Sequence, residues 1–206
     1  MKHSMIKLIP CLALTLITLT VAGPAEAQPG TKMTVNEATI KRMSVFLSNF
    51  TELGFWEIDS PTAMAREDLV RFGIQHNDIN NFKSRIVNKK SRHGDHAIEA
   101  RWVAESVKKY FDLELEHGSV MESDPPYYYD GKLYHFYGAD GEAAYHARVR
   151  EVFKLPDGTI AMTGELYNAN DDDDDDVTYP FEAVAKPYQF GGKDTWSIVS
   201  LHTKTD

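Results

Sequence analysis

The first half of the chain repeats its apolar residues at helical spacing. Three such segments lie between residues 33 and 111, and they are predicted to form three helices. Thr34 followed by Glu37 has the form of a capping box and predicts the start of the first helix, which Gly54 ends. One face of this helix carries five apolar residues, namely Ile40, Met43, Phe46, Leu47 and Phe50.

The other two helices follow after short breaks. Ser60-Pro61 predicts the start of the second helix, because proline is tolerated in a first helical turn. The third helix covers about residues 100 to 111. The basic stretch between them, residues 79 to 97, is expected to be irregular.

The second half of the chain alternates apolar and polar residues, which is typical of strands. Asp-Gly pairs at 130–131 and 157–158 predict hairpin turns. A two-residue loop at the second turn places Arg150 opposite Glu165 and forms a charge pair. A turn led by Pro156 with a glycine bulge would shift this register.

These patterns together predict an α+β fold. About three N-terminal helices are expected to pack on one face of a curved C-terminal antiparallel sheet of four to six strands. Pro180 lies within an alternating segment and suggests an edge strand or a bulge. The alternation also changes near Ile198, which suggests a second bulge.

The start of the chain has the three parts of a cleavable secretory signal. Lys2 and Lys7 precede an apolar stretch, residues 8–22, and Ala25-Glu26-Ala27 forms a cleavage site. We therefore expect residues 1–27 to be a signal peptide and residues 28–206 to form a single exported globular domain, periplasmic or extracellular. A retained anchor is the alternative, but the apolar stretch is shorter than the roughly 20 residues that a membrane-spanning helix needs. No membrane span is expected in the mature chain.

Composition narrows the chemistry of the exported part. Cys11 is the only cysteine, and cleavage would remove it, so the mature chain would have neither a disulfide nor a thiol nucleophile. The formal net charge of the whole chain is −9. An acidic chain is a poor partner for nucleic acid or for an anionic membrane surface, because both select basic proteins.

Two segments carry candidate metal ligands. An acidic run between two predicted strands offers the oxygen ligands that calcium prefers, and it consists of Asp171, Asp172, Asp173, Asp174, Asp175 and Asp176. It lacks the glycine of a calcium-binding loop, so a solvated loop is the favoured interpretation. The segment His93-Gly94-Asp95-His96 has no further ligand motif and is expected to be a surface loop.

Candidate catalytic and binding residues are few. His76 could act as a general base with Asp78 as its orienting group, although both residue types are common at helix ends. Aromatic residues are dense in the first hairpin, and Tyr128, Tyr134 and Phe136 could bind a ligand if they are exposed. Alternation is expected to send about half of the hairpin's aromatic residues into the core.

Five short segments of the chain have a recognisable sequence, and they are residues 47–52, 72–77, 79–82, 107–111 and 139–142. Together they resemble a family of uncharacterised bacterial secreted proteins and lipoproteins of unknown function. The resemblance implies one exported domain and no particular chemistry. The basic segment and the acidic run depart from it.

We derive two hypotheses for the function. The first is non-enzymatic binding of a cell-envelope component or a partner protein, without a cofactor. The second is an envelope hydrolase or lyase that uses His76 with a distant carboxylate. Calcium binding through the acidic run is a weaker third alternative.

Overall fold

The computed structural model describes residues 30–80, 84–138, 145–169 and 178–204. This part of the chain contains three α-helices, as the sequence predicts: α1 (Glu37–Thr51), α2 (Arg66–Ile79) and α3 (Ala100–Phe111). A short 3-10 helix, Pro61–Ala63, precedes α2. The signal segment and the acidic run Asp171 to Asp176 lie outside the described residues.

The strands form two antiparallel sheets, whereas the sequence predicted one. The large sheet has six strands in the order β1-β7-β8-β9-β10-β2, and their bounds are Thr31–Lys32, Tyr145–Lys154, Ile160–Asn168, Tyr179–Phe190, Lys193–Thr203 and Glu57–Ile58. The small sheet has four strands in the order β3-β4-β6-β5, with bounds Ile86–Ser91, Gly94–Glu99, Leu133–Phe136 and Tyr128–Tyr129. The fold class α+β is thus confirmed. The small sheet draws two of its strands from the stretch predicted to be irregular.

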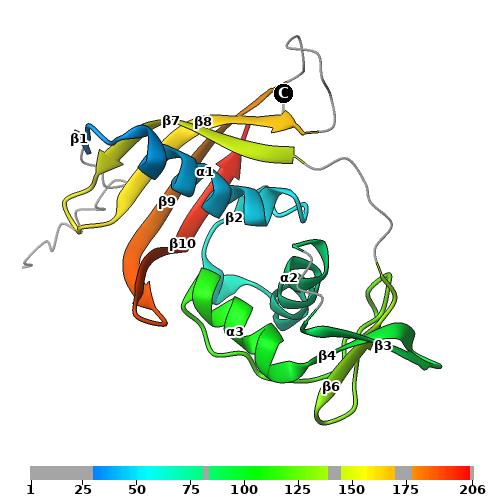
Figure 1. Ribbon diagram of the computed structural model, residues 1–206. Coiled ribbons are helices and arrows are strands. Elements are labelled where there is room, and N and C mark those ends of the chain that lie inside the picture. Colours follow the sequence, from blue (N-terminus) through cyan, green and yellow to red (C-terminus); the bar gives the residue numbers. More distant parts are fainter. Residues whose placement is uncertain (1–29, 81–83, 139–144, 170–177, 205–206) are drawn as a thin grey trace, which may run out of the picture.

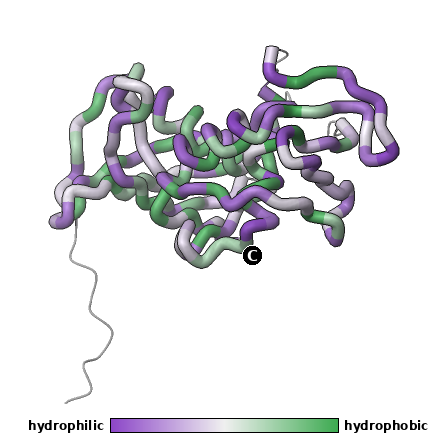
Figure 2. The backbone as a smooth tube through the Cα atoms, turned by 90° about the horizontal axis from the view of Figure 1, so that it is seen from below, coloured by the Kyte–Doolittle hydropathy of each residue, from purple (hydrophilic) through white to green (hydrophobic). Residues whose placement is uncertain are grey.

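Helices α2 and α3 lie between the two sheets, while α1 crosses the large sheet (Figure 1). One core joins α1, α2 and α3 to the large sheet and includes Phe50, Phe72 and Phe111. A second core joins the opposite sides of α2 and α3 to the small sheet and includes Ile74 and Val103. Hydrophobic and hydrophilic positions interleave along the tube in Figure 2, and buried and exposed residues alternate within β7, as expected for a sheet with one buried face.

Helix α1 also closes an edge of the large sheet. The short strand β1 pairs only with the end of β7, at Lys154 and Phe153. Further along β7, Ser44 Oγ accepts a hydrogen bond from the N–H of Val149 at 3.0 Å, and Ser48 Oγ accepts one from the N–H of Ala147 at 2.9 Å. Hydroxyl groups from the helix thus take the place of a neighbouring strand for these buried amides.

Two predicted helix starts are wrong by a few residues. The cap of α1 is Asn36, whose side chain accepts a hydrogen bond from the N–H of Thr39, and not Thr34. Asparagine is at least as good a cap as threonine, and Asn36 lies two residues closer to the apolar face. Pro61 opens the 3-10 helix, and α2 begins only at Arg66.

The predicted register of the β7–β8 hairpin is also wrong. Lys154 pairs with Ile160, and a bulge after Val149 then brings Arg148 opposite Glu165. The longer turn followed by the bulge displaces the register that a two-residue loop would give. Both Arg148 and Arg150 contact Glu165, so the predicted charge pair forms in spite of the shift.

The last two strands show where proline and a bulge can sit. Pro180 is not on an edge strand, because β9 pairs with β8 on one side and with β10 on the other. It is the second residue of β9, close to the point where the β9–β10 ladder ends. The bulge predicted near Ile198 is confirmed by a register shift between Ile198 and Ser200.

Candidate functional site

An open groove lies along the side of α1 that faces α3 and the tip of the β9–β10 hairpin. We call it the α1 groove, and its volume is about 440 Å³. Its apolar lining includes Val45, Phe46, Tyr110 and Trp196. Its charged lining consists of Lys41, Arg42 and Lys109, without a carboxylate.

Packed aromatic rings form the floor of the α1 groove. The ring of Phe46 stacks on that of Tyr110 with centroids 6.0 Å apart, and it lies 5.9 Å from the ring of Trp196. Phe46 and Tyr110 are each only 5% exposed, so they are fixed by the core beneath them. Val45, in contrast, is 57% exposed at the groove. The floor is thus packed into the core, and one large apolar side chain remains uncovered.

The cations at the rim differ in their surroundings. Nη2 of Arg42 donates to the carbonyl oxygen of Asp194 at 2.9 Å, and its guanidinium lies 5.2 Å from the ring centre of Trp196. Nζ of Lys109 lies 4.6 Å from the ring centre of Tyr110 and donates to the Tyr110 hydroxyl at 3.1 Å. Burial, and then the charge of Arg85, lower the pKa of Lys109. Burial of Tyr110 raises the pKa of its hydroxyl above its ordinary value.

A smaller hollow of about 320 Å³ adjoins the α1 groove and shares Arg42 and Trp196 with it. It adds polar groups from the β9–β10 hairpin, including Tyr188 and Asp194. The hydroxyl of Tyr188 donates to the carbonyl oxygen of Lys108 at 2.9 Å, which fastens the hairpin to the end of α3. Trp196 thus lines both hollows.

His76 lies behind the floor of the α1 groove. It is 3% exposed, its ring stacks on Phe72 at 5.5 Å and meets the edge of Tyr110 at 4.7 Å. Burial, followed by the charges of Lys109 and Arg85, lowers the pKa of His76 to about 3. The imidazole is therefore uncharged at neutral pH.

His76 and Asp78 are two residues apart on α2 and therefore point in different directions. Two residues along a helix differ by about 200° in direction, and Asp78 lies near Tyr127, whose pKa it helps to raise. Asn80 links His76 to the carboxylate of Glu52. Nδ2 of Asn80 lies 3.1 Å from His76 Nδ1 and donates to Glu52 Oε1 at 3.2 Å.

Glu52 was missed in the sequence because nothing in the pattern distinguishes a glutamate that follows a helix. Burial raises the pKa of the Glu52 carboxyl group. The hydrogen bond from Asn80 and the nearby His146 lower it and so partly offset this rise. Nε2 of His146 lies 3.7 Å from Glu52 Oε2.

The aromatic hairpin does not present its rings on one surface. Tyr134 and Phe136 are 0% and 1% exposed and belong to the second core. Tyr128 lies on the other face and is half-buried, with its ring stacked on that of His93 at 3.8 Å. The three candidate binding residues are thus divided between the two faces of the small sheet.

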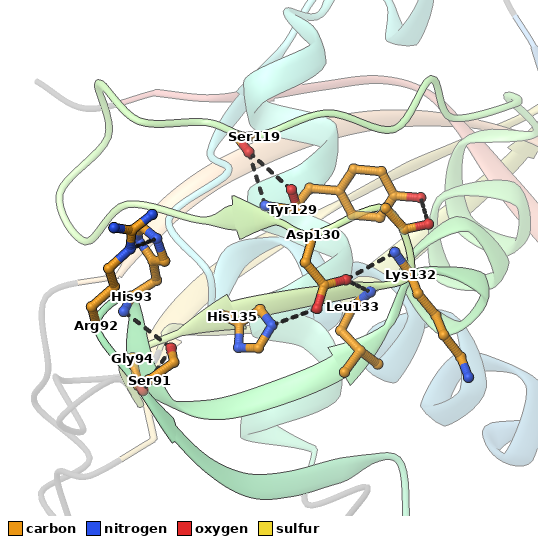
Figure 3. A network of polar contacts seen from close by, with 11 residues as sticks. Ser91, Arg92, His93, Gly94, Ser119, Tyr129, Asp130, Lys132, Leu133 and His135 are labelled. Carbon is orange, nitrogen blue, oxygen red and sulfur yellow. Dashed lines mark hydrogen bonds and ion pairs between the residues drawn. The ribbon is translucent and has the colours of Figure 1, made fainter.

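Figure 3 shows the polar network at this hairpin. Oδ1 of Asp130 accepts from the backbone N–H groups of Lys132 and Leu133, and Oδ2 lies 2.9 Å from His135 Nε2. The hydrogen bond from His135, ahead of those from the backbone, lowers the pKa of Asp130. Nδ1 of His135 is buried and has no hydrogen-bond partner among the described residues. These contacts fix the turn of the hairpin.

The segment His93-Gly94-Asp95-His96 forms the turn and the start of β4, next to this network. Across the described ranges, no three His, Cys, Asp or Glu side chains are grouped so that they could hold a metal ion. Within those same ranges, none of the helices has the length and apolar character required to cross a bilayer.

Comparison with known proteins adds no relative: no family model matches the chain, and neither a curated protein nor a solved structure matches it. The resemblance to secreted proteins of unknown function is therefore unsupported by these comparisons. The function has to be argued from the geometry of the site alone.

Proposed function

We propose that the protein is a non-enzymatic, exported binding domain whose α1 groove takes a segment of a partner protein. The segment would carry a bulky apolar side chain next to a carboxylate. The observation that carries this proposal is the open aromatic floor whose lining includes three cations and no carboxylate.

The residue types at the α1 groove support binding. Tryptophan, tyrosine and arginine dominate the few interface residues that supply most of the binding energy, and Trp196, Tyr110 and Arg42 all line the groove. The alternative of an enzyme depends on His76, which is nearly excluded from solvent and separated from Glu52 by Asn80. That arrangement favours the binding hypothesis over acid–base catalysis.

The openness of the groove favours a protein segment over a small apolar ligand. Sites for small molecules enclose about 70–90% of the ligand surface, whereas Val45 at this groove is largely exposed. A helix or strand of a partner can cover such a groove from one side.

Charge indicates which segment would fit. Three cations line the groove in a chain whose net charge is −9, so the positive charge is local. An acidic segment would be attracted here while the rest of the surface repels it.

A random peptide library displayed on phage and selected on the purified protein tests the proposal. We expect enrichment of peptides in which a large apolar residue adjoins Asp or Glu. The variant V45D should lose this enrichment, because it buries a carboxylate against the bound segment. V87D is the matched control, since Val87 is also half-exposed, at 50%, but lies on β3.

Both variants should melt at the temperature of the unmodified protein, because neither side chain is in a core. Failure to enrich any peptide sequence, or equal enrichment on V45D, would exclude the α1 groove as a protein-binding site. Selective binding of envelope lipid or glycan that V45D abolishes would equally contradict a protein partner.

A further inference from the structure

We infer that Lys109 is the residue that selects an acidic segment, by pairing its ammonium group with the carboxylate of the partner. This inference rests on the proposed binding function of the α1 groove. It assigns to one of the three cations a role that the other two do not share.

Arg42 is already engaged within the protein. Its guanidinium lies over Trp196 and donates to the carbonyl oxygen of Asp194. Recruiting it to a ligand would cost these contacts. Its geometry is suited to holding Trp196 in place.

Lys41 is exposed at the outer rim of the groove. Exposed ion pairs contribute little, because water and salt screen them and because a free side chain must be ordered. Lys41 is therefore expected to contribute general attraction and not selection.

Lys109 is half-buried, and among the described residues its one hydrogen-bond partner, the hydroxyl of Tyr110, is uncharged. Its ammonium donates to the hydroxyl of Tyr110 and lies over the same ring. The nearby Glu105 forms an ion pair with Arg85, in which Glu105 Oε1 lies 2.8 Å from Arg85 Nη2. Among the described residues, no carboxylate lies within ion-pairing distance of Lys109 Nζ.

The neighbouring Lys108 shows the opposite arrangement. Its ammonium lies 3.0 Å from Asp112 Oδ1 and 3.2 Å from Glu114 Oε1. Two successive lysines on α3 thus differ: Lys108 forms ion pairs, whereas Lys109 forms none among the described residues and feels the charge of Glu105 only from a greater distance. The lysine without an ion pair is the one that lines the groove.

A carboxylate that meets Lys109 would gain more than one at an exposed lysine. The ammonium has already lost part of its water, so pairing costs little further desolvation, and a charge-assisted hydrogen bond is the strongest kind available. The depressed pKa of Lys109 reports the same unfavourable environment. We expect an acidic peptide to bind about 10-fold more tightly than its amide counterpart.

The test uses the peptide most enriched by selection and a second peptide in which its Asp or Glu is replaced by the amide. Fluorescence anisotropy measures the affinity of both for the unmodified protein and for K109Q, K109M, K109R and K108Q. K109M keeps the alkyl chain over Tyr110, so it provides a second neutral variant if K109Q does not fold.

Neutral variants should discriminate less than about 2-fold between the two peptides. K109R should restore the discrimination, and K108Q should retain it. These two variants distinguish the charge in the groove from the total charge of α3.

Two results would overturn the inference in different ways. If the neutral variants still prefer the acidic peptide, Lys109 does not select it, although the binding function would stand as long as V45D blocks both peptides. If selection yields no peptide at all, the binding function and the role of Lys109 fail together.

Discussion

The serine hydroxyls of α1 lead to a prediction about stability. The double variant S44A/S48A removes the two hydroxyl groups that accept hydrogen bonds from the N–H groups of Val149 and Ala147. Those residues are 2% and 4% exposed, and the two hydrogen bonds are partly buried. The variant also removes the hydrogen bond that Ser48 Oγ donates to the carbonyl oxygen of Ser44 at 2.9 Å.

The expected magnitude follows from two opposing effects. A buried N–H group left without an acceptor costs about 1–3 kcal/mol. Alanine in place of serine within a helix returns up to about 0.5 kcal/mol. We therefore expect the free energy of unfolding to fall by about 0.5–2.5 kcal/mol for each substitution.

Urea denaturation followed by circular dichroism measures this loss as a lower midpoint with an unchanged slope. T39A is the matched control, because Thr39 is on α1 but its side chain makes none of the contacts to β7. It should change the free energy by less than about 0.5 kcal/mol. A double variant as stable as T39A would refute the reasoning that α1 satisfies the sheet edge.

The remaining predictions concern pH and a close backbone contact. The pKa of His76 in the folded protein is about 3, which is below its value of about 6.5 in the unfolded chain. The unfolded chain therefore binds more protons than the folded protein in this range. As a result, the free energy of unfolding decreases as the pH falls from about 6.5 toward 3. Urea denaturation at pH 7 and at pH 5 measures this decrease, which should be about 2 kcal/mol smaller in H76F than in the unmodified protein. An equal decrease in both proteins would contradict the role of His76. G94A should cost about 2–5 kcal/mol, because its Cβ would meet the carbonyl oxygen of Phe136 at 2.1 Å. G131A has the strained φ of +96° but open space, so it should cost only about 1–2 kcal/mol in the same assay; an equal loss in both glycine variants would exclude the clash.

The helices could be predicted from the sequence because they depend on local spacing. All three were found, and α3 was bounded correctly, because its apolar stripe ends where α3 ends, at Phe111. Their first residues were less certain, since Asn36 and Thr34 are both good caps and only tertiary packing decides between them.

The sheets could be predicted only in part, because pairing is not a local property. The basic residues of β3 conceal its strand character, since all but Ile86 are exposed and alternation is absent. A bulge moves the register of β7 without a sequence signal at Arg150. Two separate sheets were therefore merged into one.

The α1 groove could not be predicted at all. Val45 comes from α1, Lys109 from α3 and Trp196 from β10. Only the packing of the helices against the large sheet brings them together. His76 was recognised as a candidate, but the sequence could not show that it would be enclosed.

The position of α2 and α3 between two cores has a consequence for how the protein folds. Val70 and Val103 face the small sheet from helices whose other sides complete the large core. Neither sheet can be removed without exposing one side of both helices to water. We expect hydrogen exchange in α2 and α3 to be as slow as in the central strands, because these helices can open only when both cores do. Fragments that end within this layer would be prone to aggregate, so the chain has to be complete before it is stable.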